Sequence, residues 1–165
     1  MTLHKGEVLF RQGEVGPLYR LRSGLLKVIR LQEDGTPFLF NLLLPGEIFP
    51  HHSLITPKEY HGTAVAVIDC KVEVIEAEEW YRQLQQNPEQ YREVALLLQS
   101  KLRTMQERID QITTVSAHKR LQLLRQWLTK YVHETQIEEM LTQEEIGQLI
   151  GIRRETVNRL MRKDS

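Results

Sequence analysis

Two short apolar stripes near the C-terminal end of the chain predict a pair of packed helices. Apolar residues recur at the helical i, i+3, i+4 spacing within 146–150 and again within 157–161. Thr142 and Glu145 have the Thr-x-x-Glu spacing of a capping box, which starts the first helix. Gly151 follows that helix, at a place where a residue of positive φ ends it. The pattern therefore predicts a helix-turn-helix, a unit that commonly binds DNA.

Short β-prone runs alternate with glycines between about residues 5 and 75, and this pattern predicts an all-β domain. Glu33-Asp34-Gly35-Thr36 is a hairpin signal of the Asp-Gly class with one run on each side of it. Regular short strands separated by turn signals are typical of a barrel or a sandwich. The predicted strands cover 18–22, 25–31, 38–44, 63–67 and 72–75.

A long helix beginning at Asn87 and Pro88 has an apolar pattern of its own, after a shorter helix predicted over 76–86. Its seam positions keep the alternating 4-3 spacing of a coiled coil, and they are Tyr91, Ala95, Leu98, Leu102, Met105, Ile109, Ile112 and Ser116. Such a narrow stripe predicts a homodimer joined mainly through Leu98, Leu102, Met105, Ile109 and Ile112. Packing on its own β domain is the alternative, and Val94 and Leu97 widen the stripe enough for both contacts.

A third helix is predicted from Ala117 to about Val132, with Ser116 as its N-cap. Its apolar face would pack on the helix-turn-helix, and it consists of Leu121, Leu124 and Leu128. We therefore expect a β-roll effector or sensor domain over 1–86, a coiled-coil dimerisation helix over 87–115 and a DNA-binding domain over 116–165. The hinge between sensing and DNA-binding parts is expected near 113–116.

The composition of the chain favours some classes of function and excludes others. Twenty-two basic and twenty-two acidic residues cancel over the chain, yet five arginines or lysines stand against the single acid Glu155 between Gln148 and Lys163. Cys70 is the one cysteine, which excludes an intramolecular disulfide and a four-cysteine iron-sulfur cluster within the chain. No apolar run is long enough for a membrane span or a signal peptide, so we expect a cytoplasmic protein without a membrane partner.

The outward face of the second short helix carries side chains that can read bases. With the apolar residues of 157–161 turned inward, the outward residues are Arg154, Glu155, Asn158, Arg159 and Arg162. Arginine donates two hydrogen bonds to guanine, and glutamate accepts one from cytosine. An ordinary solvated basic helix is the alternative interpretation.

The segment from Glu144 to Arg159 resembles the DNA-binding segment of the CRP/FNR transcription regulators. The resemblance implies an α+β fold: an N-terminal eight-stranded β jelly roll like that of cyclic-nucleotide-binding domains, a long dimerisation helix and a C-terminal helix-turn-helix of winged-helix type. It also implies a homodimer on double-stranded DNA, with RNA polymerase as a further partner. Base contacts to a TGTGA-type half-site would fall to Arg154, Glu155 and Arg159, and Arg153, where the family often has a capping serine, would bind a phosphate.

In the family a β-hairpin wing follows the recognition helix, whereas this sequence stops at Ser165. We therefore expect a DNA-binding domain that lacks its wing, either through truncation or naturally. Correct base chemistry with an affinity for DNA below that of a winged relative is the expected consequence.

The family's cyclic-nucleotide members hold the phosphate with a glutamate and an arginine, and this chain differs at both places. His51 stands near the position of the glutamate, and Tyr60 or His61 near that of the arginine. The positions of the base contacts carry Met105 and Gln106 in place of hydroxyls. The sequence therefore argues against cyclic AMP and leaves the effector unknown. A ligand-independent regulator, in which the altered pocket is only packing, is the second hypothesis.

Three histidines gather in the same stretch, and the candidate effector pocket consists of His51, His52, Tyr60, His61, Leu102 and Met105. His52 falls close to where haem-containing members of the family place an axial ligand, so it is a candidate haem ligand. A polar loop without a ligand is the alternative. A metal-binding cupin enzyme would share the jelly roll, but adjacent His51 and His52 point to opposite sides in an extended chain and the DNA-binding segment would be unexplained. We expect a protein that is not an enzyme.

Overall fold

A computed structural model describes residues 1–132 and 136–164 of the chain. The chain divides into two compact units, Met1–Arg103 and Thr104–Ser165, and the division falls inside one continuous helix. Each unit has its own core and is described by itself.

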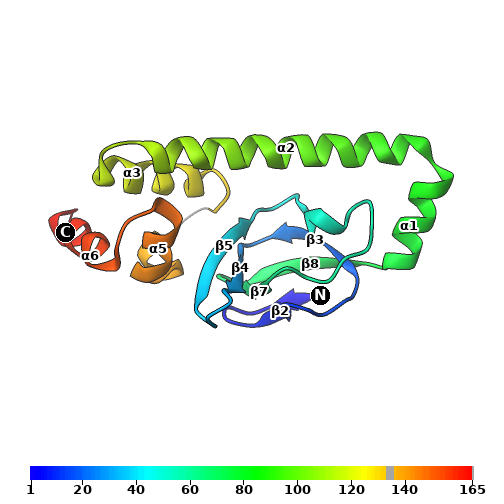
Figure 1. Ribbon diagram of the computed structural model, residues 1–165, viewed down its shortest axis with the longest axis horizontal. Coiled ribbons are helices and arrows are strands. Elements are labelled where there is room, and N and C mark those ends of the chain that lie inside the picture. Colours follow the sequence, from blue (N-terminus) through cyan, green and yellow to red (C-terminus); the bar gives the residue numbers. More distant parts are fainter. Residues whose placement is uncertain (133–135, 165) are drawn as a thin grey trace. The chain divides into compact units, whose positions relative to one another are not determined.

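The first unit contains two four-stranded antiparallel sheets (Figure 1). One sheet has the order β1 (Thr2–Leu3), β8 (Cys70–Ile75), β3 (Leu18–Ser23) and β6 (Ile48–Phe49). The other has the order β2 (Val8–Phe10), β7 (Thr63–Ala66), β4 (Leu26–Leu31) and β5 (Pro37–Leu43). Apart from β4 and β5, sequence neighbours are therefore split between the two sheets, which confirms the predicted eight-stranded β-roll.

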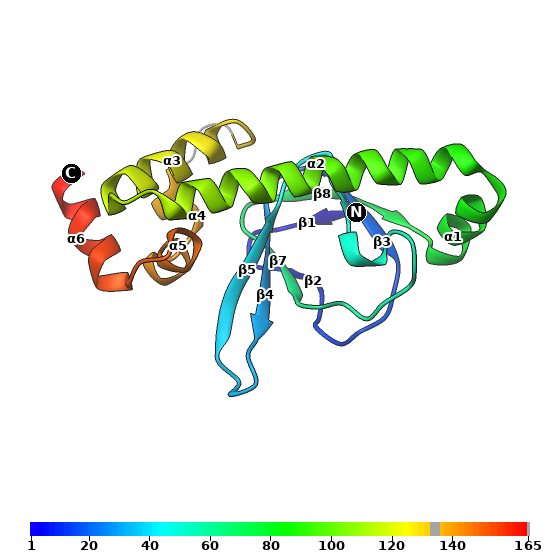
Figure 2. The ribbon, with the colours of Figure 1, turned by 45° about the horizontal axis from the view of Figure 1, so that its top comes forward.

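The predicted Asp-Gly hairpin joins β4 and β5, which pair from Leu26 opposite Leu43 to Leu31 opposite Pro37. Gly35 has a φ of 82°, and its N–H donates to the carbonyl of Gln32. Figure 2 shows this hairpin extending away from the remaining strands. All five predicted strands are present, whereas β1, β2 and β6 were missed because two or three residues are too few for a period to show.

Helices complete the first unit. A 3-10 turn, η1 (His51–Ser53), follows β6, and α1 (Ala77–Gln86) follows β8. The next helix, α2 (Pro88–Thr113), begins at the predicted proline. Trp80 of α1 donates its indole N–H to the carbonyl of Leu54 at 2.8 Å. A buried cluster lies around this bond and contains Leu18, Ile48, Leu54, Trp80, Leu84 and Val94.

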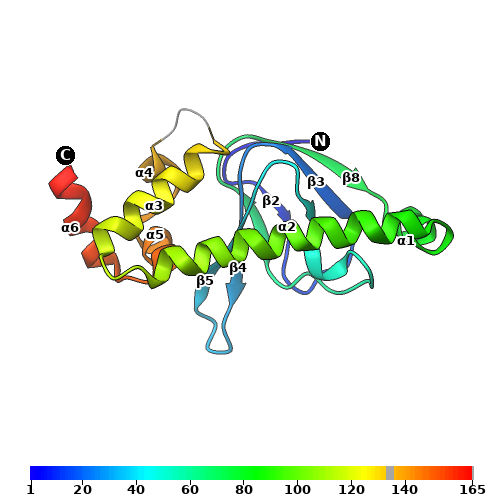
Figure 3. The same ribbon diagram turned by 90° about the horizontal axis from the view of Figure 1, so that it is seen from above.

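The second unit consists of the end of α2 followed by α3 (Ala117–Thr129), α4 (Ile137–Met140), α5 (Gln143–Ile150) and α6 (Arg154–Asp164). The Ser116 side chain caps α3 by accepting from the N–H of Lys119, as predicted. α3 lies against α5 (Figure 3). Fully buried residues from α3, α5 and α6 form the core, among them Leu121, Leu124, Leu128, Ile146, Ile150 and Val157. None of the helices in the described part of the chain is both long and apolar enough to cross a membrane.

Candidate DNA-binding interface and the interior of the β-roll

The turn between α5 and α6 is fixed by contacts at both ends of α5. The Thr142 hydroxyl accepts from the N–H of Glu145 at 3.2 Å, and the Glu145 carboxylate accepts from the N–H of Thr142 at 3.0 Å. Gly151 ends the helix with a φ of 67°. The N–H groups of Gly151 and Ile152 both donate to the carbonyl of Gly147. The predicted capping box and C-terminal glycine are thus confirmed, and they set the direction in which α6 leaves.

Two arginines that were not predicted from the sequence to do so bind the C-terminal end of α5. Arg120 of α3 donates to the carbonyls of Ile150 and Gly151 at 3.2 and 3.3 Å. Arg108 of α2 donates to the carbonyl of Leu149 at 2.7 Å and lies over the Trp127 ring. Burial lowers the pKa of Arg108 to about 10, so the side chain stays charged at neutral pH. Positive charge at the end of a helix stabilises its unpaired carbonyls.

Gly147 is required for a close backbone approach, which yields a stability prediction. A Cβ at Gly147 would lie 2.6 Å from the carbonyl oxygen of Ile152, and backbone cannot swing aside. We expect Gly147→Ala to lower the free energy of unfolding of this unit by about 2 kcal/mol, because overpacking outweighs alanine's helix preference. Thermal unfolding followed by circular dichroism measures the change.

The matched control for Gly147→Ala is Gly151→Asn. Only the Arg120 guanidinium lies near Gly151, at 3.6 Å from an added Cβ, and asparagine tolerates a positive φ. We expect a loss below about 1 kcal/mol for this control. Equal losses in the two variants would contradict the close approach at Gly147.

The two faces of α6 separate as the sequence predicted. Val157 is fully buried, whereas Leu160 and Met161 are half-buried. The opposite face is exposed and carries Arg154, Glu155, Arg159 and Arg162, with Arg153 exposed directly before the helix. This arrangement presents guanidinium groups and one carboxylate on a single face of a short helix, as base recognition in a major groove requires.

Asn158 and Arg153 differ from the other candidate DNA contacts. Asn158 is half-buried, and its amide N–H donates to the Gln143 side chain at 3.1 Å, which ties α6 to the start of α5. Arg153 is the N-cap of α6, because its carbonyl accepts from the N–H groups of Thr156 and Val157. A guanidinium has no acceptor, so this side chain cannot cap the helix and is free to turn toward a ligand.

The structure brings together only part of the candidate effector pocket, because Tyr60 and His61 border one cleft whereas Leu102 and Met105 do not line it. Tyr60 is 4% exposed and donates its hydroxyl to the carbonyl of Pro17 at 2.8 Å, and its ring packs on Phe10. Burial raises the pKa of Tyr60 far above its usual value. Leu102 and Met105 are 57% and 48% exposed on α2. Tyr60 therefore belongs to the core of the roll, and the two α2 side chains are accessible to solvent.

His52 and His61 stack face to face, with ring centroids 3.7 Å apart. The Nε2 atom of His52 lies 3.0 Å from the carbonyl of Glu59, so that nitrogen must carry a hydrogen and donate it. Partial loss of water around the ring, together with repulsion from His61, lowers the pKa of His52. This donation leaves the lone pair of Nδ1 available, and metal-bound histidines commonly donate their other ring N–H to a backbone carbonyl. The role of His52 as a haem ligand therefore stays a prediction.

The histidines of the described residues are not arranged as a metal site of cupin type requires. His51 and His52 lie in the 3-10 turn η1, so the extended geometry assumed from the sequence was wrong, although the two rings do have different partners. Within residues 1–132 and 136–164, no three histidine, cysteine or acidic side chains gather closely enough to hold a metal ion. Beside this segment lies an open cleft of about 610 Å³ with both polar and apolar walls, bordered by Gln12, Arg30, Lys58, Tyr60 and His61.

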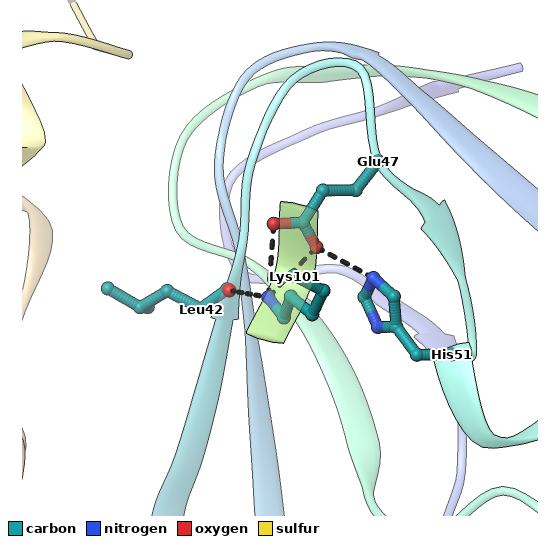
Figure 4. Close-up of polar contacts among 4 residues, drawn as sticks. All are labelled: Leu42, Glu47, His51 and Lys101. Atoms are coloured by element: carbon teal, nitrogen blue, oxygen red, sulfur yellow. Dashed lines mark hydrogen bonds and ion pairs between the residues drawn. The ribbon is translucent and has the colours of Figure 1, made fainter. Parts of the chain in front are cut away.

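A buried ion pair, also missed from the sequence, joins the roll to α2 (Figure 4). Lys101 donates to both carboxylate oxygens of Glu47 at 3.0 Å and to the carbonyl of Leu42 at 3.3 Å. The Nε2 atom of His51 lies 3.2 Å from the same carboxylate. Burial raises the pKa of Glu47, but the hydrogen bond from His51 and the charge of Lys101 outweigh it, so the pKa lies below its usual value. The carboxylate is therefore charged at neutral pH.

The seam of α2 is largely uncovered within the single chain. Leu102, Met105, Ile109 and Ile112 are between 37% and 57% exposed. Leu98 is the exception, because it is half-buried against the cluster around Trp80. Four of the five predicted dimer contacts thus form an apolar stripe that is available to a partner helix.

Comparison with known proteins matches both units. The family model for the cyclic nucleotide-binding domain matches residues 1–87. The chain is similar to the cyclic AMP receptor protein of Thermus thermophilus, with 30% identity over 95% of this chain and 72% of the relative. It is also 26% identical to a CRP-like cAMP-activated global transcriptional regulator of Mycobacterium tuberculosis, over 95% of this chain and 73% of that protein. A solved structure of a CRP-family transcriptional regulator, also from Thermus thermophilus, has a TM-score of 0.79 at 24% identity, covering 99% of this chain and 83% of that one.

Proposed function

The chain belongs to the CRP/FNR family of transcription regulators, and we propose that it reads a TGTGA-like palindrome in double-stranded DNA as a homodimer. The observation that carries the proposal is the exposed face of α6, where Arg154, Glu155 and Arg159 stand clear of the core. The capping box and the glycine of the α5–α6 turn aim that face outward. Arg153 and Arg162 flank it and would bind phosphates.

Dimerisation is part of the proposal because a palindrome needs two recognition helices related by a two-fold axis. The exposed stripe of α2, formed by Leu102, Met105, Ile109 and Ile112, supports it. Side chains of this kind, repeated at coiled-coil spacing, bury apolar surface against a second copy of themselves.

The signal received by the roll is proposed to be other than cyclic AMP. Neither His51 nor His61 offers the bidentate charge that a phosphodiester prefers, and Lys101 already pairs with Glu47. The open cleft bordered by Arg30 and Lys58 offers a place for a small effector. We assign the chain no catalytic step, and its partners are chromosomal DNA in the cytoplasm and RNA polymerase.

The proposal is tested by the binding of purified protein to two duplexes in fluorescence anisotropy. One holds two inverted TGTGA half-sites with centres about one helical turn, ~10 base pairs, apart, and the other has the same composition in scrambled order. We expect roughly 10³-fold tighter binding to the palindrome, with no change on addition of cyclic AMP. Equal affinity for both duplexes would refute sequence-specific recognition.

A further inference from the structure

The ammonium group of Lys101 is buried and has its hydrogen-bond partners inside the chain. The side chain lies in the interior with 8% of the residue exposed, and all three of its hydrogen-bond partners belong to the roll. Both oxygens of Glu47 and the carbonyl of Leu42 surround the ammonium group (Figure 4). A buried ammonium is costly without a partner. The helix therefore has one favourable position on the roll, in which this ion pair is closed.

The ion pair joins segments that are far apart in the sequence. Leu42 belongs to β5, Glu47 to the turn before β6, His51 to η1 and Lys101 to α2. The Glu47 carboxylate is at the centre, because it accepts from both His51 and Lys101. Any movement of α2 along or around its axis has to break the contacts of one carboxylate.

Lys101 also sets the rotation of α2 about its own axis. The buried residues of the helix are Gln90, Val94 and Lys101, which lie on one stripe facing the roll. Leu102, the next residue, is 57% exposed and belongs to the seam. Successive residues are about 100° apart around a helix. With Lys101 held inward, Leu102 is turned about 100° away from the roll, to the exposed side of the helix.

We propose that Lys101 is a positioning residue whose ion pair with Glu47 fixes α2 in the rotation that displays the dimer seam. The ligand-free chain is then the DNA-binding form, and a signal received by the roll acts by opening the pair. An anion that competes for Lys101 must displace a carboxylate that is already hydrogen-bonded, and it would leave Glu47 buried without its cation. The inference rests on the proposed function only where DNA binding is the readout.

The test compares Lys101→Met with Arg92→Met in the full chain. Arg92 makes an exposed ion pair with Glu89 on the same helix at 2.9 Å, so it is a matched control for loss of one charge. Hydrogen exchange is measured at the amides of 44–49 and 94–101, and operator affinity is measured without added small molecules. We expect Lys101→Met to speed exchange roughly tenfold or more and to weaken operator binding about tenfold. Arg92→Met should change either quantity at most about twofold.

A second variant separates the ion pair from general damage to the fold. Glu47→Gln removes the charge at nearly constant size and should give the same two changes, which also serves where Lys101→Met folds poorly. In the double variant the combined loss of affinity should be smaller than the product of the single losses, because no unpaired charge is left buried.

The outcomes are distinct for the two proposals. Unchanged exchange and unchanged affinity in Lys101→Met and Glu47→Gln would overturn the positioning role. A wild-type protein that binds the palindrome only after a small molecule is added would overturn the ligand-free direction and leave DNA recognition standing. Equal binding to palindrome and scrambled duplex would refute the proposed function. Hydrogen exchange would still test whether the Lys101–Glu47 ion pair fixes the position of α2.

Discussion

An Arg154→Ala variant is expected to bind the TGTGA palindrome at least roughly 30-fold more weakly than the wild type, with almost unchanged affinity for random duplex. Arg154 is exposed at the first turn of α6, where a side chain reaches base edges when the helix enters the major groove. One bidentate contact to guanine contributes about 1–3 kcal/mol of discrimination. Two copies in a dimer make that roughly 2–6 kcal/mol, which corresponds to about 30-fold to 10⁴-fold.

The measurement is a competition titration against duplexes that change one base pair of the half-site at a time. Arg154→Ala should lose its preference at one position and keep it at the others. Arg162→Ala is the matched control, because it removes the same charge from the last turns of the helix. It should weaken binding to all sequences alike and reduce the salt dependence of binding. Similar losses on specific and random duplexes for Arg154→Ala would reject its assignment to a base.

The helix-turn-helix could be predicted from sequence because its determinants are local. Thr142 and Glu145 are three residues apart, and Gly151 ends the helix that they begin. The apolar residues that pack α6 on α5 recur within single helical turns. Each signal lies within a few residues of the structure that it specifies, so no knowledge of distant contacts was needed. The same is true of the Asp34-Gly35 hairpin.

The interior of the roll could not be predicted in the same way, because its contacts join distant parts of the chain. Lys101 and Glu47 are 54 residues apart, and neither residue type signals burial by itself. Lys101 is seven residues after Val94 and therefore lies on the same buried stripe of α2. This spacing was the one sequence signal that could have predicted its burial. Tyr60 was assigned to a pocket because it stands near the position of the family's phosphate-binding arginine, although its ring completes a core of aromatic residues from other strands.

The two faces of α2 explain why one helix gave two competing interpretations. Gln90, Val94 and Lys101 are the buried residues of α2, whereas Leu102, directly after Lys101, and Ile109, one heptad further on, are exposed. The sequence predicted that both contacts were compatible. Contact with the roll is now confirmed, and contact with a second copy stays a prediction. A substitution that disturbs only the exposed stripe is therefore the direct test of the dimer.

Ile109→Glu is expected to separate the dimer into folded monomers. Ile109 is 54% exposed in the single chain, so the substitution leaves the core of either unit intact. At a coiled-coil seam the two copies would face each other, and each would lose an apolar contact worth about 2–3 kcal/mol and place a carboxylate in the interface. The loss of at least roughly 5 kcal/mol raises the dissociation constant of the dimer by 10³-fold or more. Sedimentation velocity measures it, and an unchanged circular dichroism spectrum shows that the fold survives.

Ser100→Glu is the control for Ile109→Glu, because it adds the same charge at an exposed position on the side of α2 opposite the seam. It should stay dimeric. The DNA readout then distinguishes loss of the dimer from loss of base recognition. A monomer meets only one half-site, so Ile109→Glu should bind a palindrome and a single half-site with similar affinity. Arg154→Ala weakens both duplexes but stays dimeric and keeps the advantage of the palindrome. An Ile109→Glu protein that sediments as a dimer and still prefers the palindrome would place the interface elsewhere than on α2.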